Sequence, residues 1–416
     1  MLTSNIKFKN FNISKFKNLK NFKNEKWFKK IRLFESLKLN YKYSYTKEQI
    51  KKINKNKNFR LIGMGGSTLG AEAIYQFLNH KIKKINKNKN FRLIGMGGST
   101  LGVEAIYQFL NHKIKKKFIF INNLNSKLNN YEKKIKATNI IISKSGNTLE
   151  TIVNSNALVN GSKNIFITEN KKNYLRNLAN DLKAEIVEHK NYIGGRYSVL
   201  SEVGMLPAEI MGLDEKKFKR LNYLINNKNF LNELIKNVSA ILKFVKEKKF
   251  NSIILNYDNK SENLFKWYQQ LVAESLGKKS KGILPVISTM PSDNHSLLQL
   301  YLDGPKNNFF TFFSTQDTKS DKINNKFLQK THNYLRNKSF SKIIYAQKSA
   351  TEKVFYKKKL PFRSFEVKKR NEEVLGELFC FFILETILLG RALKVNPFDQ
   401  PSVELIKKET KKILFN

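Results

Sequence analysis

The sequence predicts an α/β protein with two doubly wound domains, each built on a five-stranded, mainly parallel sheet, and a C-terminal helix. Two observations lead to this fold class. The chain has 416 residues, which is room for two domains of ordinary size. Short apolar runs alternate with stretches of helical pattern, and the runs are continuously apolar, as in parallel strands buried on both faces.

The expected strands form two sets along the chain. The first set lies at residues 92–96, 118–123, 139–143, 164–168 and 185–188. The second set lies at residues 252–257, 284–289, 309–313, 342–346 and 363–367. Helices are expected at residues 147–160, 174–182 and 262–276, and from about residue 403. Helical crossovers between parallel strands give a doubly wound sheet, and the helical region 215–250 separates the two sets.

A tandem repeat lies within the first set. Residues 51–82 and 83–114 are identical except for Ala71 in the first copy and Val103 in the second. Two copies are too few for a solenoid, so one copy is surplus, through a recent duplication or an error in the sequence. Because the second copy runs directly into the next strand by a short crossover, we expect residues 95–102 to be the working loop.

These features divide the chain into five parts. They are an N-terminal extension (1–50), the surplus copy (51–82), a first domain (83–250), a second domain (251–390), and a C-terminal loop and helix (391–416). The surplus copy is expected to lie at the periphery of the first domain.

The charge of the chain is strongly positive, with 78 Lys and Arg against 33 Asp and Glu, a net +45. The basic residues are scattered with Asn, Ile and Phe through every segment, whereas a nucleic-acid surface concentrates them in one stripe. Compositional drift explains this pattern better, so no nucleic-acid partner is expected.

Several classes of protein are disfavoured by what the sequence lacks. No secretory signal is visible, and the longest apolar run, residues 378–389, is too short to cross a bilayer. A cytoplasmic protein with no membrane partner is therefore expected. A single cysteine, Cys380, excludes a disulfide framework and is expected to be an inert core thiol. The five histidines have no paired metal-ligand spacing, so neither a metal nor another cofactor is expected.

Two loops follow predicted strands and precede predicted helices, which is where phosphate groups bind. The first is the glycine loop GMGGSTLG, whose spacing matches neither the dinucleotide fingerprint nor a Walker A loop. A tight turn between strand and helix explains it equally well. The second, SKSGNTLET from residue 143, offers the hydroxyls of Ser143, Ser145 and Thr148 and the ammonium of Lys144. This set suits a phosphomonoester, although capping of the helix would need one of these residues.

Other polar residues are candidates for the chemistry itself. Arg196 follows two glycines, where it is either a structural ion-pair partner or a fixed cation facing an oxyanion. Gln270 and Glu274 lie four residues apart on one helix and share a face, so Glu274 is either a general base or a solvated surface residue. His295 in a loop and Lys407 on the last helix would ordinarily be solvated.

Taken together, these segments resemble the glucose-6-phosphate isomerase family. The matching stretches appear in the family's order and cover about residues 60 to 410: GMGGSTLG, SKSGNTLET, GGRYSVLSEVGMLP, QQLVAESLGK, HSLLQLYLDGP and NPFDQPSVELIKK. Members of this family have two sugar-isomerase (SIS) domains with a flavodoxin-like sheet, in agreement with the two sets of strands.

The resemblance implies catalytic roles for four residues. Glu274 matches the base that moves a proton between C1 and C2 through a cis-enediol, and Arg196 matches the residue that stabilises the enediolate. His295 matches a ring-opening residue that the neighbouring subunit supplies, and Lys407 matches a lysine that assists ring opening. Pro401, Ser402 and Ile406 depart from the family pattern around Lys407.

The resemblance also implies a set of substrate contacts. They are the phosphate cradle of Ser143, Lys144, Ser145 and Thr148, the glycine-loop residues Gly98 and Ser99 or their copies Gly66 and Ser67, and the glutamines Gln270 and Gln400.

The function expected from this resemblance is reversible isomerisation of glucose 6-phosphate and fructose 6-phosphate, in glycolysis and gluconeogenesis, by a homodimer without a cofactor. A positive surface potential would aid the encounter with a phosphate dianion. Two alternatives remain. One is another sugar-phosphate isomerase that also accepts mannose 6-phosphate, and the other is a non-catalytic sensor of sugar phosphates on the same domains.

Overall fold

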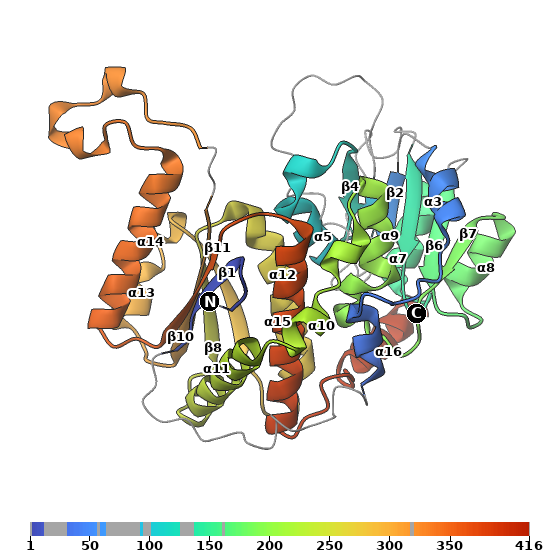
Figure 1. Ribbon diagram of the computed structural model, residues 1–416. Coiled ribbons are helices and arrows are strands. Elements are labelled where there is room, and N and C mark those ends of the chain that lie inside the picture. Colours follow the sequence, from blue (N-terminus) through green and yellow to red (C-terminus); the bar gives the residue numbers. More distant parts are fainter. Residues whose placement is uncertain are drawn as a thin grey trace.

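The computed structural model describes residues 2–11, 31–55, 59–63, 92–94, 101–124, 137–159, 163–316 and 320–415. Two sheets lie side by side, with helices α12 (Glu262–Leu276) and α15 (Glu372–Ala392) between them (Figure 1). Helix α14 (Phe340–Lys357) lies outside the second sheet, and α8 (Tyr174–Asp181) lies outside the first. The predicted α/β fold class with two sheets is confirmed.

The first sheet is parallel throughout, and helices connect its strands. Its strands are β4 (Phe118–Ile121), β5 (Thr138–Ile142), β6 (Asn164–Thr168) and β7 (Glu185–Glu188), together with β2 (Phe59–Gly63) and β3 (Arg92–Ile94) of the repeat. Its helices are α3 (Lys47–Asn54), α5 (Leu101–Phe109), α7 (Leu149–Leu158), α8 and α9 (Glu202–Met211). All five residues of β5 are buried, as a central parallel strand requires.

The second sheet has the strand order β1–β11–β10–β8–β9. Four strands are parallel, namely β8 (Asn251–Asn256), β9 (Leu284–Thr289), β10 (Asn308–Thr315) and β11 (Phe362–Val367). The edge strand β1 (Ile6–Lys9) is antiparallel, with Ile6 and Phe8 buried and Lys7 and Lys9 exposed. This alternation is typical of a half-buried edge strand, and exposed lysines protect such an edge from further pairing.

Two sequence predictions differ from the structure here. Residues 342–346 form part of helix α14, not a strand, and β1 takes the fifth place in the second sheet. The short run KIIYA has no periodicity that separates a strand from a helix, and the Ser339 hydroxyl oxygen accepts a hydrogen bond from the Lys342 backbone N–H at the start of α14. The described part of residues 1–50 contributes both β1 and contacts to the first domain, such as the 2.7 Å hydrogen bond from Tyr41 to Glu202.

Helix α15 forms the centre of the molecule. It contacts α12, α11 (Lys228–Lys246) and α10 (Leu221–Ile225), and nearly all of its residues are buried. These contacts explain why residues 378–384 of this helix are apolar on every face, while Glu377 and Glu385 are buried beside them. Cys380 lies on this helix, and burial raises the pKa of its thiol to about 12, as expected for an inert core cysteine. None of the helices in the described ranges is both long and apolar enough to cross a membrane.

The repeat contributes strands from both copies and a helix from the second. Strands β2 and β3 each pair with both β4 and β5. Helix α5 belongs to the second copy and packs against α12. There, the Gln108 amide donates to the Asn259 carbonyl and its oxygen accepts from the Asn263 backbone N–H. The glycine loops, including Gly66, Ser67, Gly98 and Ser99, lie outside the described residues, so the preference for residues 95–102 stays a prediction.

Candidate active site

The first part of the candidate site is a turn at the carboxyl end of β5. Ser143 is buried directly after this strand, and its hydroxyl lies 2.9 Å from the Thr148 hydroxyl. Thr148 occupies the N-cap of α7 without capping it, so its side chain is turned to Ser143 instead. Gly146 has a φ of +65°, and a Cβ there would lie 1.8 Å from the Asn173 side-chain oxygen. The turn therefore requires glycine, and it presents hydroxyls at a helix N-terminus.

Lys144 in this turn is directed toward the segment that leads to Arg196. Its ammonium donates to the Asn191 carbonyl at 2.8 Å and forms an ion pair with Glu169 at 3.4 Å. The lysine that was predicted to hold phosphate thus also ties the turn after β5 to the loop after β7.

The second part of the site joins residues that are far apart in the sequence. Arg196 lies in the short 3₁₀ helix η3 (Gly195–Leu200) and is only 3% exposed. Its Nη1 donates to the Glu274 carboxylate at 3.3 Å, and its Nε donates to the Ser275 hydroxyl at 2.8 Å. The Gln270 amide donates to the other Glu274 oxygen at 2.6 Å, as their shared helix face predicts. The structure therefore brings Arg196, Gln270 and Glu274 into one cluster.

Arg196 also holds the loop that precedes the last helix. Its Nη2 donates to the carbonyls of Pro397 and Asp399 at 2.6 and 3.0 Å. The Tyr197 hydroxyl donates to the same Pro397 carbonyl at 2.9 Å. With every nitrogen of its guanidinium engaged, Arg196 is a fixed cation rather than a mobile surface charge.

A second cation fastens this loop to the end of α12. Lys278, two residues after the end of α12, forms a 2.7 Å ion pair with Asp399 and donates to the Asn396 carbonyl. The hydrogen bond from Lys278 lowers the pKa of the Asp399 carboxyl. The C-terminal loop is thus anchored to both Arg196 and the end of α12, and Gln400 follows its last anchor directly.

His295 lies at the carboxyl end of the second sheet, in the 3₁₀ helix η6 (Ser292–His295) after β9. Asp293 shapes this turn, since its carboxylate accepts hydrogen bonds from the Ser288 hydroxyl and the Thr289 backbone N–H, both at 2.8 Å. The His295 side chain is exposed, and no hydrogen bond to its ring comes from another residue within the described ranges. This placement leaves the imidazole open to solvent or to another subunit.

Lys407 and Gln400 are not joined to the cluster of Arg196 and Glu274. The final helix begins at Val403, as predicted, and forms α16 (Val403–Phe415), in which no residue is buried. The Lys407 ammonium forms a 2.5 Å ion pair with Glu404 on the same helix. Gln400 is exposed in the preceding loop.

Three residues that contact this cluster or the C-terminal loop beside it were not singled out from the sequence. The Ser275 hydroxyl accepts a hydrogen bond from Arg196. The Tyr197 hydroxyl lies within hydrogen-bond distance of the Ser275 hydroxyl and of the Pro397 carbonyl, and Lys278 forms an ion pair with Asp399. Ser275 and Lys278 belong to the segment AESLGK, and Tyr197 belongs to GGRYS. Their position within the quoted motifs could have marked them as candidate site residues. No rule of sequence spacing, however, predicts that these motifs contact the C-terminal loop.

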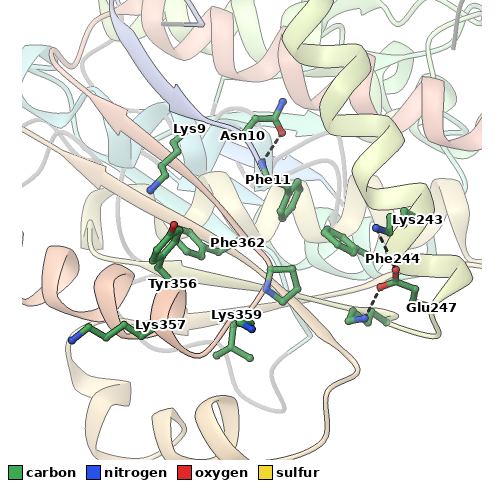
Figure 2. Close-up of a pocket in the computed structure, with 13 residues that line it drawn as sticks. Lys9, Asn10, Phe11, Lys243, Phe244, Glu247, Tyr356, Lys357, Lys359 and Phe362 are labelled. Carbon is green, nitrogen blue, oxygen red and sulfur yellow. Dashed lines mark hydrogen bonds and ion pairs between the residues drawn. The ribbon is translucent and has the colours of Figure 1, made fainter. Parts of the chain in front are cut away.

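A separate cavity of about 810 Å³ lies at the opposite, amino end of the parallel strands of the second sheet. Figure 2 shows Lys9, Phe11, Tyr356 and Phe362 around it, with Glu247 between basic side chains. Glu247 pairs with Lys243 and Lys249. None of the candidate site residues lines this cavity, and ligands of doubly wound sheets bind at the carboxyl ends of the strands. We therefore do not place the reaction there.

Comparisons with known proteins agree with the fold and the motifs. The family model for phosphoglucose isomerase matches residues 80–416. Glucose-6-phosphate isomerase of Mycoplasmopsis pulmonis is 35% identical over 294 residues, which is 66% of this chain and 68% of that protein. The enzyme of the same name from Methanocaldococcus jannaschii is 29% identical over 389 residues, 88% of this chain and 86% of that protein.

Solved structures share the fold. A hypothetical protein of Thermus thermophilus has a TM-score of 0.72 at 22% identity, covering 92% of this chain and 91% of its own. A glucose-6-phosphate isomerase of Chlamydia trachomatis has a TM-score of 0.65 at 16% identity, covering 91% of this chain and 72% of its own. The fold, the ordered motifs and the match over most of the chain lead to one conclusion: the chain belongs to the phosphoglucose isomerase family.

Proposed function

We propose that this chain interconverts glucose 6-phosphate and fructose 6-phosphate by moving a proton between C1 and C2 of the open-chain sugar. The observation that carries the proposal is the Glu274 carboxylate, which accepts hydrogen bonds from both Gln270 and Arg196 in a member of this family. Aldose–ketose isomerisation needs a proton acceptor beside a fixed positive charge, because loss of the proton from C2 leaves a negatively charged enediolate.

In the proposed reaction Glu274 is the acid–base group. Its carboxylate takes the proton from C2 of the open-chain aldose, and the electron pair of the broken C–H bond forms the C1–C2 double bond of the enediolate. The electron pair of the C1 carbonyl moves onto O1 in this step. A proton then passes from O2 to O1, Glu274 returns its proton to C1, and the electron pair left on O2 forms the carbonyl group at C2. Arg196 stabilises the oxygen on which negative charge develops, and its contacts with Ser275, Pro397 and Asp399 hold it in place while charge develops.

The turn after β5 is proposed to bind the phosphate. Ser143 and Thr148 place their hydroxyls side by side at the N-terminus of α7, where backbone N–H groups and the helix dipole favour an anion. Lys144 joins this turn to Asn191, on the segment that carries Arg196. Binding of phosphate at one end of the sugar is thereby coupled to the position of the cation at the other end.

The test of this function is the formation of fructose 6-phosphate from glucose 6-phosphate by the purified full-length chain. We expect turnover of glucose 6-phosphate, and rates measured in parallel with mannose 6-phosphate decide how broad the substrate range is. Faster turnover of mannose 6-phosphate would support the alternative of another sugar-phosphate isomerase. Binding of glucose 6-phosphate without any turnover would support the non-catalytic sensor and contradict the proposal.

We further propose that the active unit is a homodimer in which each site receives His295 from the neighbouring subunit. Two observations support this. The His295 ring is exposed, and helix α16 exposes a group of apolar side chains that a second copy would cover: Val403, Leu405, Ile406, Ile413, Leu414 and Phe415.

A cytoplasmic location and a role in glycolysis stay predictions from the family resemblance, and fractionation of the source cells tests the predicted location.

Shared sites make a sharp prediction for mixed dimers. The variants Glu274→Gln and His295→Ala are each expected to be nearly inactive alone, whereas their mixture after subunit exchange should regain activity. In a mixed dimer one site combines an intact Glu274 with an intact His295, so up to half of the sites of that dimer work. Activity of the refolded mixture, measured against each variant alone, checks this; no gain in a mixture shown to contain mixed dimers would contradict a shared site.

A further inference from the structure

The two copies of the repeat place their strands against the same partners in the same register. Leu61 of β2 pairs with Phe120 on β4 and with Ile140 on β5. Leu93 of β3, which is the equivalent residue of the second copy, pairs with the same Phe120 and the same Ile140. Both strands run parallel to both neighbours, so the two copies are superimposed in their pairing.

One sheet position cannot hold two strands at once. The backbone of a strand forms its ladder of hydrogen bonds on two edges only, and β5 uses its other edge for β6, where Ile140 pairs with Ile165. The position between β4 and β5 therefore accepts a single strand. We propose that β2 and β3 are alternative occupants of this position, so that either copy of the repeat completes the first sheet.

The two arrangements are closely balanced. The strand sequences FRLIG are identical, so the backbone pairing with β4 and β5 does not discriminate between them. The elements on either side, α3 and α5, are common to both arrangements. Residues 64–100 separate β2 from α5 in the sequence, and residues 55–91 separate α3 from β3, which is the same number of residues. Loop-closure entropy depends on length, so it also favours neither copy strongly.

The exchange bears on the proposed active site. Each strand is followed in the sequence by its own copy of the glycine motif GMGGSTLG, which family resemblance assigns to substrate binding. If the proposed isomerase function holds, the chain has two interchangeable segments that lead into this motif, and damage to one copy is compensated by the other. The inference about the sheet itself does not depend on that function, because it rests on strand pairing alone.

Proline substitutions test the exchange through the backbone. Proline removes the N–H that a central strand donates to its ladder, so Leu61→Pro excludes β2 from the position and Leu93→Pro excludes β3. Leu61→Val and Leu93→Val are the matched controls, since they keep the N–H and suit a strand. All variants are made in the full-length chain, and each is examined by urea unfolding and by the rate of fructose 6-phosphate formation.

We expect each single proline variant to unfold cooperatively and to keep its activity within about two-fold of the parent chain, because the population shifts to the other copy. The double variant should lose cooperative unfolding of the first domain together with its activity. If one single variant loses as much stability and activity as the double variant, only one copy can occupy the position and the proposal is wrong. It is equally wrong if the double variant unfolds like the parent. The unfolding curves distinguish these outcomes even for a chain that proves inactive.

Discussion

Replacing Glu274 by Gln should lower kcat by about 10²–10⁴-fold, the usual contribution of a general base. The amide has nearly the shape of the carboxylate and can still face Gln270 and Arg196, which contact Glu274 at 2.6 and 3.3 Å. It cannot take a proton from carbon, however. Because the loss is confined to the chemical step, KM should change much less than kcat. Steady-state rates in both directions of the isomerisation measure both constants.

Glu262→Gln is the matched control for this variant. Glu262 lies in the first turn of the same helix, α12, where it pairs with Lys266 at 2.9 Å and is remote from the cluster around Glu274. Removal of this partly exposed charge should leave kcat unchanged. A Glu274→Gln enzyme that turns over as fast as the Glu262→Gln control would show that Glu274 is not the base.

The largest effect on stability is expected at the ion pair between Arg363 and Glu385. Both side chains are fully buried, Arg363 on β11 and Glu385 on α15. The Tyr268 hydroxyl on α12 donates to the same carboxylate at 2.9 Å, and burial raises the pKa of that phenol. Replacing Glu385 by Ala leaves the guanidinium buried and unpaired, which should lower the free energy of unfolding by about 3–5 kcal/mol. Urea unfolding of the purified chain measures the change.

Two controls separate the burial of charge from other effects of this substitution. Glu409→Ala removes an exposed ion pair with Lys412 on α16 and should change stability by less than about 1 kcal/mol. Arg363→Met combined with Glu385→Leu removes both charges and should recover much of the stability lost in Glu385→Ala, because no unpaired charge remains. Equal midpoints for Glu385→Ala and Glu409→Ala would contradict the account of this pair.

The sequence predicted nine of the strands in the two sheets from their continuous apolar runs, such as NIII in β5 and FFTFF in β10. It failed at residues 342–346, where the short run KIIYA is part of an eighteen-residue helix. It also missed β1, whose alternating pattern IKFK spans only four residues and whose partner β11 lies at the other end of the chain. Short segments are decided by tertiary contacts, which local pattern does not contain.

Within the candidate site, the contact between Gln270 and Glu274 was predictable because both lie on one helix. The contact of Arg196 with Glu274 joins η3 to α12, and only the family resemblance pointed to it. Nothing in the sequence indicated the ion pair between Lys278 and Asp399, because residue type alone does not distinguish one lysine from the other basic residues, 78 in all. The ion pair of Lys407 with Glu404 was likewise not predicted. The family resemblance pointed Lys407 toward the substrate, whereas on an exposed helix a lysine pairs readily with a carboxylate three residues away.

The most direct test of the central claim is the fate of the C2 proton of glucose 6-phosphate in D₂O, followed by NMR. A carboxylate base that removes this proton and returns one to C1 exchanges part of it with solvent, so deuterium should enter the sugar as isomerisation proceeds. The Glu274→Gln enzyme should lose both the isomerisation and the exchange, while the Glu262→Gln enzyme keeps both. Exchange and isomerisation at the parent rate in Glu274→Gln would contradict the account.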